Sequence, residues 1–77
     1  MINVLLFAQL KDELGKESLS IEGNGLSVAQ IKEKIKAEFH LDGLETVMTA
    51  VNEEFAGDEE LVADGDTIAF IPPVSGG

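Results

Sequence analysis

The groups with unusual chemistry in this 77-residue chain stand at its C-terminal end, in the stretch PPVSGG at 72–77. Gly76 and Gly77 lack Cβ atoms, so the walls of an enclosing pocket can close around bare backbone. The α-carboxylate of Gly77 is ionised at neutral pH, because its ordinary pKa is about 3.5. The two prolines fix φ and favour an extended chain. At about 3.3 Å per residue the stretch would reach roughly 20 Å beyond the domain.

A carboxylate at such an ending is a poor acyl electrophile, because its negative charge is spread over both oxygens. It reacts only after it gains a leaving group, for instance an adenylate formed with ATP on another enzyme. Sulfur that replaces the adenylate would leave a terminal thiocarboxylate, whose ionised sulfur is soft and nucleophilic. We therefore expect a reactive atom that other proteins load and use. The simpler alternative is a frayed chain end without function.

The composition argues against other kinds of site. The chain has 15 Asp and Glu residues against five Lys and a net charge of −10, so it lacks the basic surface that nucleic acids require. The same charge disfavours an anionic membrane surface, and no run approaches the ~20 apolar residues that span a bilayer. Without cysteine, and with one histidine, neither a thiolate nucleophile nor a metal site is expected. We expect a cytoplasmic protein whose charge either attracts a basic partner or only keeps it in solution.

The elements that must position the ending begin and finish the chain. The almost wholly apolar run at 2–8 predicts a central strand covered on both faces, and the near-continuous apolar run at 67–71 predicts a second central strand. The alternating stretch ESLSIE predicts a more exposed strand, and LKDELGK predicts a turn with at most one helical turn. The stretch TVMTAVNEEF predicts a strand that leads into a turn, with a short strand near Glu60–Leu61. Pro72 cannot donate to a sheet, so pairing should stop there.

The stretch LSVAQIKEKIKAEF carries the clearest local signal, that of a helix. Ser27 and Gln30 have the spacing of a capping box at its N-terminus. Four apolar residues then recur at helical spacing on one face, namely Val28, Ile31, Ile35 and Phe39. A helix between the first and last strands supplies the crossover that parallel neighbours need. These patterns predict one α+β domain, a mixed sheet crossed by one main helix, over 1–71, with an extended tail over 72–77.

This order with a terminal Gly-Gly resembles the β-grasp, or ubiquitin-like, fold. Within it, FAQLKDELG, AVNEEF and above all DGDTIAFIPPVSGG resemble the small subunit of molybdopterin synthase, the MoaD family. The resemblance covers essentially the whole chain. The thiamine-pathway carrier is also similar, but its tail typically lacks the paired prolines.

The resemblance implies a sulfur carrier of molybdenum cofactor biosynthesis that is not itself an enzyme. An E1-like adenylating enzyme of the MoeB type would use ATP to activate Gly77, and sulfur would be installed as a thiocarboxylate. The tail would enter a large subunit of the MoaE type, where two transfers to cyclic pyranopterin monophosphate build the dithiolene of molybdopterin. The complexes of this family are heterotetramers, and the carrier binds no cofactor or metal. The residues implied to enter the large subunit are Pro72, Pro73, Val74, Ser75 and Gly76.

The resemblance also implies a partner interface formed by Phe7, Phe55 and Ile71. The alternative for each is packing in the domain's own core, because apolar strand residues are usually buried. The acidic loop Glu53–Glu60 is either a solvated loop or a contact for basic residues of the loading enzyme. Three other functions stay open: a carrier for thiamine or cysteine synthesis, a protein modifier joined through Gly77 to lysine, and a plain acidic binding module.

Overall fold

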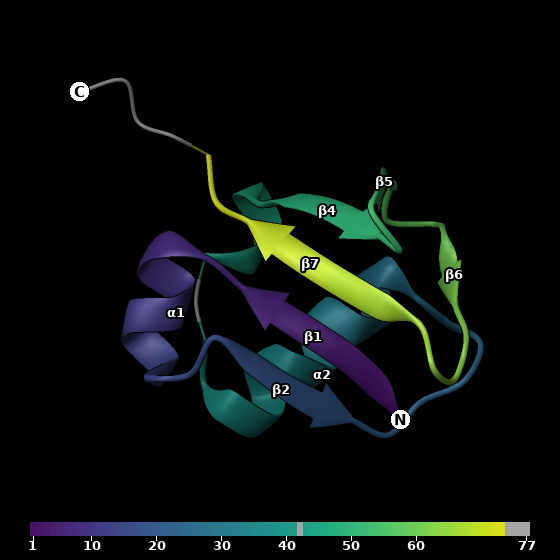
Figure 1. Ribbon diagram of the computed structural model, residues 1–77, viewed down its shortest axis with the longest axis horizontal. Coiled ribbons are helices and arrows are strands. Elements are labelled where there is room, and N and C mark those ends of the chain that lie inside the picture. Colours follow the sequence, from purple (N-terminus) through teal and green to yellow (C-terminus); the bar gives the residue numbers. More distant parts are fainter. Residues whose placement is uncertain (42, 74–77) are drawn as a thin grey trace.

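The computed structural model describes residues 1–41 and 43–73, which form one mixed sheet crossed by a helix (Figure 1). Its elements follow the chain as β1 (Ile2–Leu6), α1 (Ala8–Leu14), β2 (Ser18–Ile21), β3 (Leu26–Ser27), α2 (Val28–Phe39), the 3-10 turn η1 (Leu44–Thr46), β4 (Met48–Val51), β5 (Glu54–Phe55), β6 (Leu61–Val62) and β7 (Thr67–Ile71). The predicted α+β architecture is confirmed. Helix α1, with seven residues, is longer than the single helical turn that the sequence indicated.

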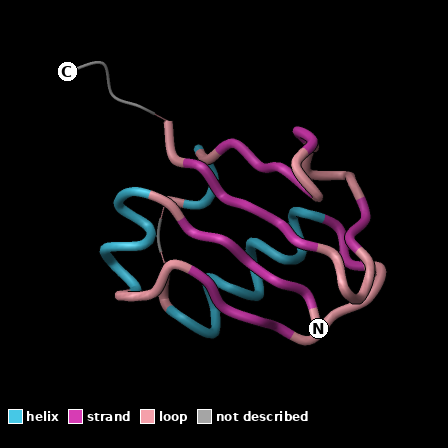
Figure 2. Tube along the Cα trace, in the orientation of Figure 1, coloured by secondary structure: helices cyan, strands magenta, loops and turns pink. Residues whose placement is uncertain are grey.

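The main sheet has the strand order β2-β1-β7-β4-β5, so the first and last long strands are its central members (Figure 2). Strands β1 and β7 run parallel, with Val4 opposite Ile68, while β1 pairs with β2 and β7 with β4 in antiparallel fashion. The parallel pair is possible because α2 crosses over between them in the chain. The short strand expected near Glu60–Leu61 is β6, which pairs with β3 in a separate small sheet.

Helix α2 begins and packs as its sequence predicts. The side chain of Ser27 accepts a hydrogen bond from the backbone N–H of Gln30, and the Gln30 side chain accepts one from the backbone N–H of Ser27. This capping box satisfies two of the backbone donors at the start of the helix. Val28, Ile31 and Ile35 are fully buried and Phe39 is half-buried, so the predicted apolar face is confirmed.

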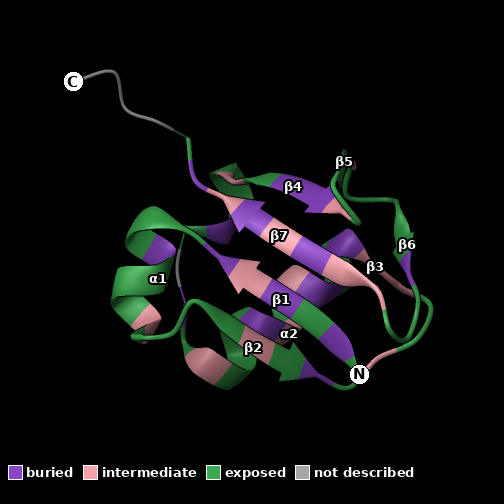
Figure 3. Ribbon diagram, viewed as in Figure 1, coloured by how far each residue is buried: buried purple, intermediate pink, exposed green. Residues whose placement is uncertain are grey.

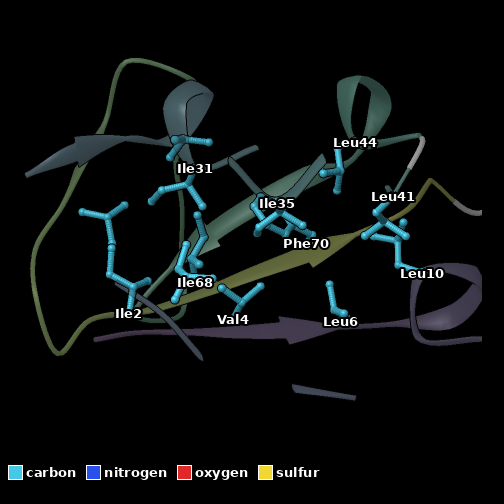
Figure 4. Packing of buried hydrophobic residues seen from close by; sticks show 13 residues of the cluster. Ile2, Val4, Leu6, Leu10, Ile31, Ile35, Leu41, Leu44, Ile68 and Phe70 are labelled. Atoms are coloured by element: carbon cyan, nitrogen blue, oxygen red, sulfur yellow. The ribbon is translucent and has the colours of Figure 1, made fainter. Parts of the chain in front are cut away.

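The core lies between α2 and one face of the sheet (Figure 4). The burial of β1 and β7 alternates: Ile2, Val4 and Leu6 are buried on one strand, and Ile68 and Phe70 on the other. Their remaining residues point to the opposite face, where the described part of the chain places no helix (Figure 3). The prediction that the first strand is covered on both faces is therefore wrong. A continuous apolar run is typical of a strand with both faces buried. The second face can be buried by another protein instead of by this chain.

Helix α2 has one side buried against the sheet and one side exposed, so we expect substitutions on its two sides to change the free energy of unfolding by different amounts. Ile35→Ala should lower the free energy of unfolding by about 2–5 kcal/mol, because it leaves a cavity against the sheet. Glu38→Ala on the exposed side of the same helix should change it by no more than about 0.5 kcal/mol. Urea unfolding of both variants measures the difference, and equal costs would contradict the placement of the core.

Candidate functional site

The open face of the sheet is built from side chains that lie in rows across the strands. Successive residues of a strand point to opposite faces, so Leu5, Ala69, Ala50 and Phe55 share one row through the pairs Leu5–Ala69, Ala69–Ala50 and Ala50–Phe55. Ile71 and Met48 are paired in the next row, towards the end of β7. Phe7 lies one residue beyond β1 at the same end, because β1 and β7 are parallel.

A hollow of about 340 Å³ lies on this face. It is lined mainly by apolar side chains from four strands and the segments beside them, namely Leu5, Phe7, Ala50, Asn52, Glu53, Phe55, Thr67, Ala69 and Ile71. The three residues expected at a partner interface, Phe7, Phe55 and Ile71, therefore line one hollow. They come from positions that are up to 64 residues apart in the chain.

The exposure of Phe7, Phe55 and Ile71 shows whether they pack in the domain's own core or lie on its surface. Phe55 is 74% exposed and Phe7 is 44% exposed, while Ile71 is half-buried on the open face. Packing in the domain's own core is therefore excluded for both phenylalanines. Exposed aromatic side chains grouped around a hollow are typical of a surface that a partner covers.

The chain leaves the sheet beside this hollow. Strand β7 ends at Ile71, as predicted from the proline that follows, and Pro72 is buried while Pro73 is exposed. A smaller hollow at this point is lined by Leu10, Gly43 and both prolines, among others. The burial of Pro72 fixes the point from which the tail starts. Val74, Ser75, Gly76 and Gly77 lie outside the described residues.

A tight turn forms the far end of the hollow, within the stretch TVMTAVNEEF where the sequence predicted a strand that leads into a turn. Asn52 and Glu53 join β4 to β5 with φ values of 50° and 71°, as a two-residue hairpin turn of the primed type requires. The Asn52 N–H donates to the Thr67 carbonyl oxygen at 2.8 Å, and the Thr67 N–H donates to Asn52 Oδ1 at 3.0 Å. The turn is thus tied to the start of β7. The predicted turn is therefore confirmed, but the short strand β5 that follows it was not predicted, because Glu53 stands where a hairpin turn usually has glycine.

The acidic residues near β6 and β7 have structural partners. Lys32 Nζ lies 2.9 Å from Asp58 Oδ1, which joins the acidic loop Glu53–Glu60 to α2. The backbone N–H of Ala63 donates to Asp66 Oδ2 at 2.9 Å. This hydrogen bond, with a smaller contribution from the Asn52 side chain, lowers the pKa of Asp66 from its ordinary value of 3.8. Asp66 is therefore a turn former, as the DGD sequence predicted.

Two further observations concern metals and membranes. Within 1–41 and 43–73, no group of three or more His, Cys, Asp or Glu side chains is arranged to hold a metal ion. No helix in the described part of the chain is long and apolar enough to cross a membrane.

Comparison with known proteins gives matches along almost the whole chain. The model of the ThiS family matches residues 4–77. The molybdopterin synthase sulfur carrier subunit of Haemophilus influenzae is 33% identical, and that of Escherichia coli is 30% identical; both alignments cover 100% of each chain.

Solved structures show the same fold. The putative molybdopterin converting factor subunit 1 of Pyrococcus furiosus has a TM-score of 0.79 at 27% identity, covering 95% of this chain and 97% of that one. One chain of the Helicobacter pylori complex of subunits 1 and 2 of molybdopterin-converting factor has a TM-score of 0.70 at 24% identity, covering 99% of this chain and 97% of that one. The small archaeal modifier protein 1 of Haloferax volcanii gives 0.78 at 20%, covering 95% and 97%. The last two likenesses show the ubiquitin-like fold alone.

The exposure of the hollow predicts that its aromatic rim contributes little to stability. Phe55→Ala should change the free energy of unfolding by no more than about 0.5 kcal/mol, as for other exposed positions. Phe70→Ala, on the buried face, should cost about 3–5 kcal/mol. Denaturant unfolding of this matched pair gives the comparison, and a large loss in Phe55→Ala would return that residue to the core.

The lowered pKa of Asp66 predicts a pH dependence of stability. A carboxyl group whose folded pKa is depressed stabilises the fold above its unfolded pKa, and the contribution is lost as pH falls through the folded value. Asp66→Asn should therefore lose stability less steeply than the wild type below about pH 4. Thermal unfolding from pH 7 to pH 2 measures the slopes, with Glu38→Gln as the control for net charge. Parallel curves for Asp66→Asn and the wild type would contradict this role.

Proposed function

The chain belongs to the ThiS family, and we propose that it is the sulfur carrier subunit of a molybdopterin synthase. The observation that carries the proposal is the apolar hollow beside the exit of the PPVSGG tail. The names and full-length similarity of the Haemophilus influenzae and Escherichia coli relatives support the same function. A docking surface and a thin tail that leaves beside it are what a carrier needs to deliver its terminus to another protein.

The reaction starts at the carboxylate of Gly77. On a partner enzyme of the E1-like, MoeB type, this carboxylate attacks ATP, releases pyrophosphate and becomes an acyl adenylate. A sulfur nucleophile at the oxidation level of sulfide then displaces AMP and leaves a thiocarboxylate. In the large subunit the thiocarboxylate sulfur bonds to a side-chain carbon of cyclic pyranopterin monophosphate and displaces an oxygen from it, which leaves as water at one carbon and as the phosphate ester oxygen at the other. Hydrolysis of the carbonyl–sulfur bond leaves the sulfur on the pterin and the carboxylate on the carrier, and a second round completes the dithiolene.

The division of work in this proposal leaves catalysis to the partners. No side chain of the described residues is assigned a role as acid, base or nucleophile, so the chain is a carrier and not an enzyme. ATP is used by the adenylating enzyme, and the carrier holds no cofactor. The large subunit would be of the MoaE type, and the Helicobacter pylori complex of subunits 1 and 2 of molybdopterin-converting factor supports a partner of this kind. The proposed assembly is a heterotetramer. The cytoplasmic location stays a prediction.

The hollow would serve as the docking surface in this scheme. Phe7 and Ile71 lie at the end of the sheet where the tail starts, so a partner that covers them is held next to the tail. Pro73, Val74, Ser75 and Gly76 would then enter the partner as an extended strand, while Pro72, which is buried in this domain, would stay at the base of the tail. Glycine at 76 and 77 lets the pocket walls approach the backbone.

Removal of Gly76 and Gly77 tests the proposal directly. The truncated chain should fail to supply sulfur for molybdopterin formation, while its melting temperature stays close to that of the wild type, because the removed residues follow the buried Pro72. The measurements are dithiolene formation with purified large subunit and pterin precursor, and thermal unfolding. Glu38→Gln, a substitution at an exposed position of α2, is purified and assayed in parallel as the control. Normal sulfur supply by the truncated chain would end the proposal.

Intact-mass analysis of the native protein separates the remaining functions. A sulfur carrier should show the mass increment of one oxygen replaced by sulfur at the C-terminus. A protein modifier would instead appear as conjugates linked through lysine. A carrier for thiamine or cysteine synthesis would show the sulfur increment but give no dithiolene with the large subunit and pterin precursor.

A further inference from the structure

The hollow on the open face exists because two small residues lie at its centre. Ala50 of β4 and Ala69 of β7 are directly opposite each other in the sheet. Larger apolar side chains surround them: Leu5 and Phe55 in the same row, and Ile71 in the next. A row with larger residues at both central positions would fill this space. The depression is therefore set by two alanines and not by a gap between elements.

The two ends of the hollow differ in character. At the end where the tail starts, the lining residues are Phe7 and Ile71, both apolar. At the opposite end they are Asn52, Glu53 and Thr67. Glu53 alone carries a charge among the described residues that line the hollow, and the chain's five lysines, at 11, 16, 32, 34 and 36, are not among them.

Glu53 occupies a position where glycine is the usual residue. Its φ of 71° lies in the left-handed region, which residues with a Cβ adopt at a cost. The hydrogen bonds between Asn52 and Thr67 hold the turn in this form. Backbone strain of this kind persists where the surrounding structure holds it and is frequent at functional sites, and here the exposed Glu53 lines the hollow.

We propose that the synthase's large subunit seats one large apolar side chain in the hollow above Ala50 and Ala69 and places a Lys or Arg opposite Glu53. This inference rests on the proposed function. The apolar insertion supplies the binding energy, because a buried anchor at the centre of an interface dominates affinity. The ion pair with Glu53 fixes the orientation of the large subunit on the sheet. With its basic residue at the Glu53 end of the hollow, the rest of its surface extends towards Phe7, Ile71 and the start of the tail.

Other occupants fit these features less well. A second copy of this chain would bring its own Glu53 and a net charge of −10 to the same surface, and like charges oppose that contact. A small apolar ligand would make no use of the carboxylate at the rim. A protein with a basic residue beside an apolar one satisfies both ends of the hollow.

Filling the hollow tests the apolar half of the proposal. Ala69→Leu adds apolar volume on the open face and should keep or raise the melting temperature. It should weaken binding to the purified large subunit by about tenfold or more, because the inserted side chain loses its place. Ser20→Leu is the matched control, because Ser20 is exposed on the same face, opposite Asn3, away from the lining of the hollow. Its dissociation constant should stay within about twofold of the wild type.

Removing the charge tests the second half. Glu53→Gln should weaken binding about two- to fivefold at low salt, as for an exposed ion pair, and the difference from wild type should shrink as salt is added. Glu38→Gln makes the same change in net charge on α2, on the other side of the sheet, and should have a smaller effect. Calorimetric titration of the large subunit with each variant, its C-terminus left as the carboxylate, measures these dissociation constants without any sulfur transfer.

The outcomes separate the inference from the function on which it rests. If the wild type binds the large subunit and Ala69→Leu binds equally well, the inference is wrong while the carrier function stands. Equal effects of Glu53→Gln and Glu38→Gln would overturn the assigned role of Glu53. Concentration-dependent dimers that Ala69→Leu abolishes, with binding to the large subunit unchanged, would make a second copy the occupant. No binding by the wild type would overturn the inference and the proposed function together.

Discussion

One helix covers one face of a five-stranded sheet, and the other features of the molecule depend on this one-sided cover. Because strand residues alternate between faces, β7 sends Ile68 and Phe70 under α2 and leaves Ala69 and Ile71 on the open side. A domain of this size buries only about 60% of its unfolded surface. The apolar side chains of the uncovered face are therefore available to another protein, and the core on the opposite face holds them in fixed rows.

Strand β7 and the proline after it connect the core, the hollow and the start of the tail within three consecutive residues. Phe70 anchors it under α2, Ile71 lines the hollow and the buried Pro72 marks the start of the tail. The parallel pairing with β1 brings Phe7 to the same end of the sheet. The tail therefore starts at a fixed place relative to the hollow, because any shift of β7 along β1 would remove its side chains from the core.

The sequence predicted those features that depend on local periodicity and chemistry. The capping box of Ser27 and Gln30, the apolar face of α2 and the end of β7 at Pro72 are all in this class. The open face was missed because an apolar run has the same composition whether its second face meets the chain's own helix or a partner. The turn after β4 was predicted, but its hairpin form with β5 was missed because the second turn residue, Glu53, is not glycine. The interface role of Phe7, Phe55 and Ile71 came from the family resemblance, and their grouping around one hollow depends on strand register, which local patterns do not specify.

The distribution of charge and strain fits a chain that presents a group and leaves its chemistry to others. Perturbed pKa values are typical of catalytic centres, but the clear shift at Asp66 is caused by a hydrogen bond from the Ala63 backbone within a turn. The strained residue of the hollow, Glu53, is exposed at the rim of an apolar surface. Strain there costs stability and gives no acid–base function to a site that is open to water. The turn does fix where the Glu53 backbone stands relative to Ala50 and Ala69, so its charge stays at one end of the hollow.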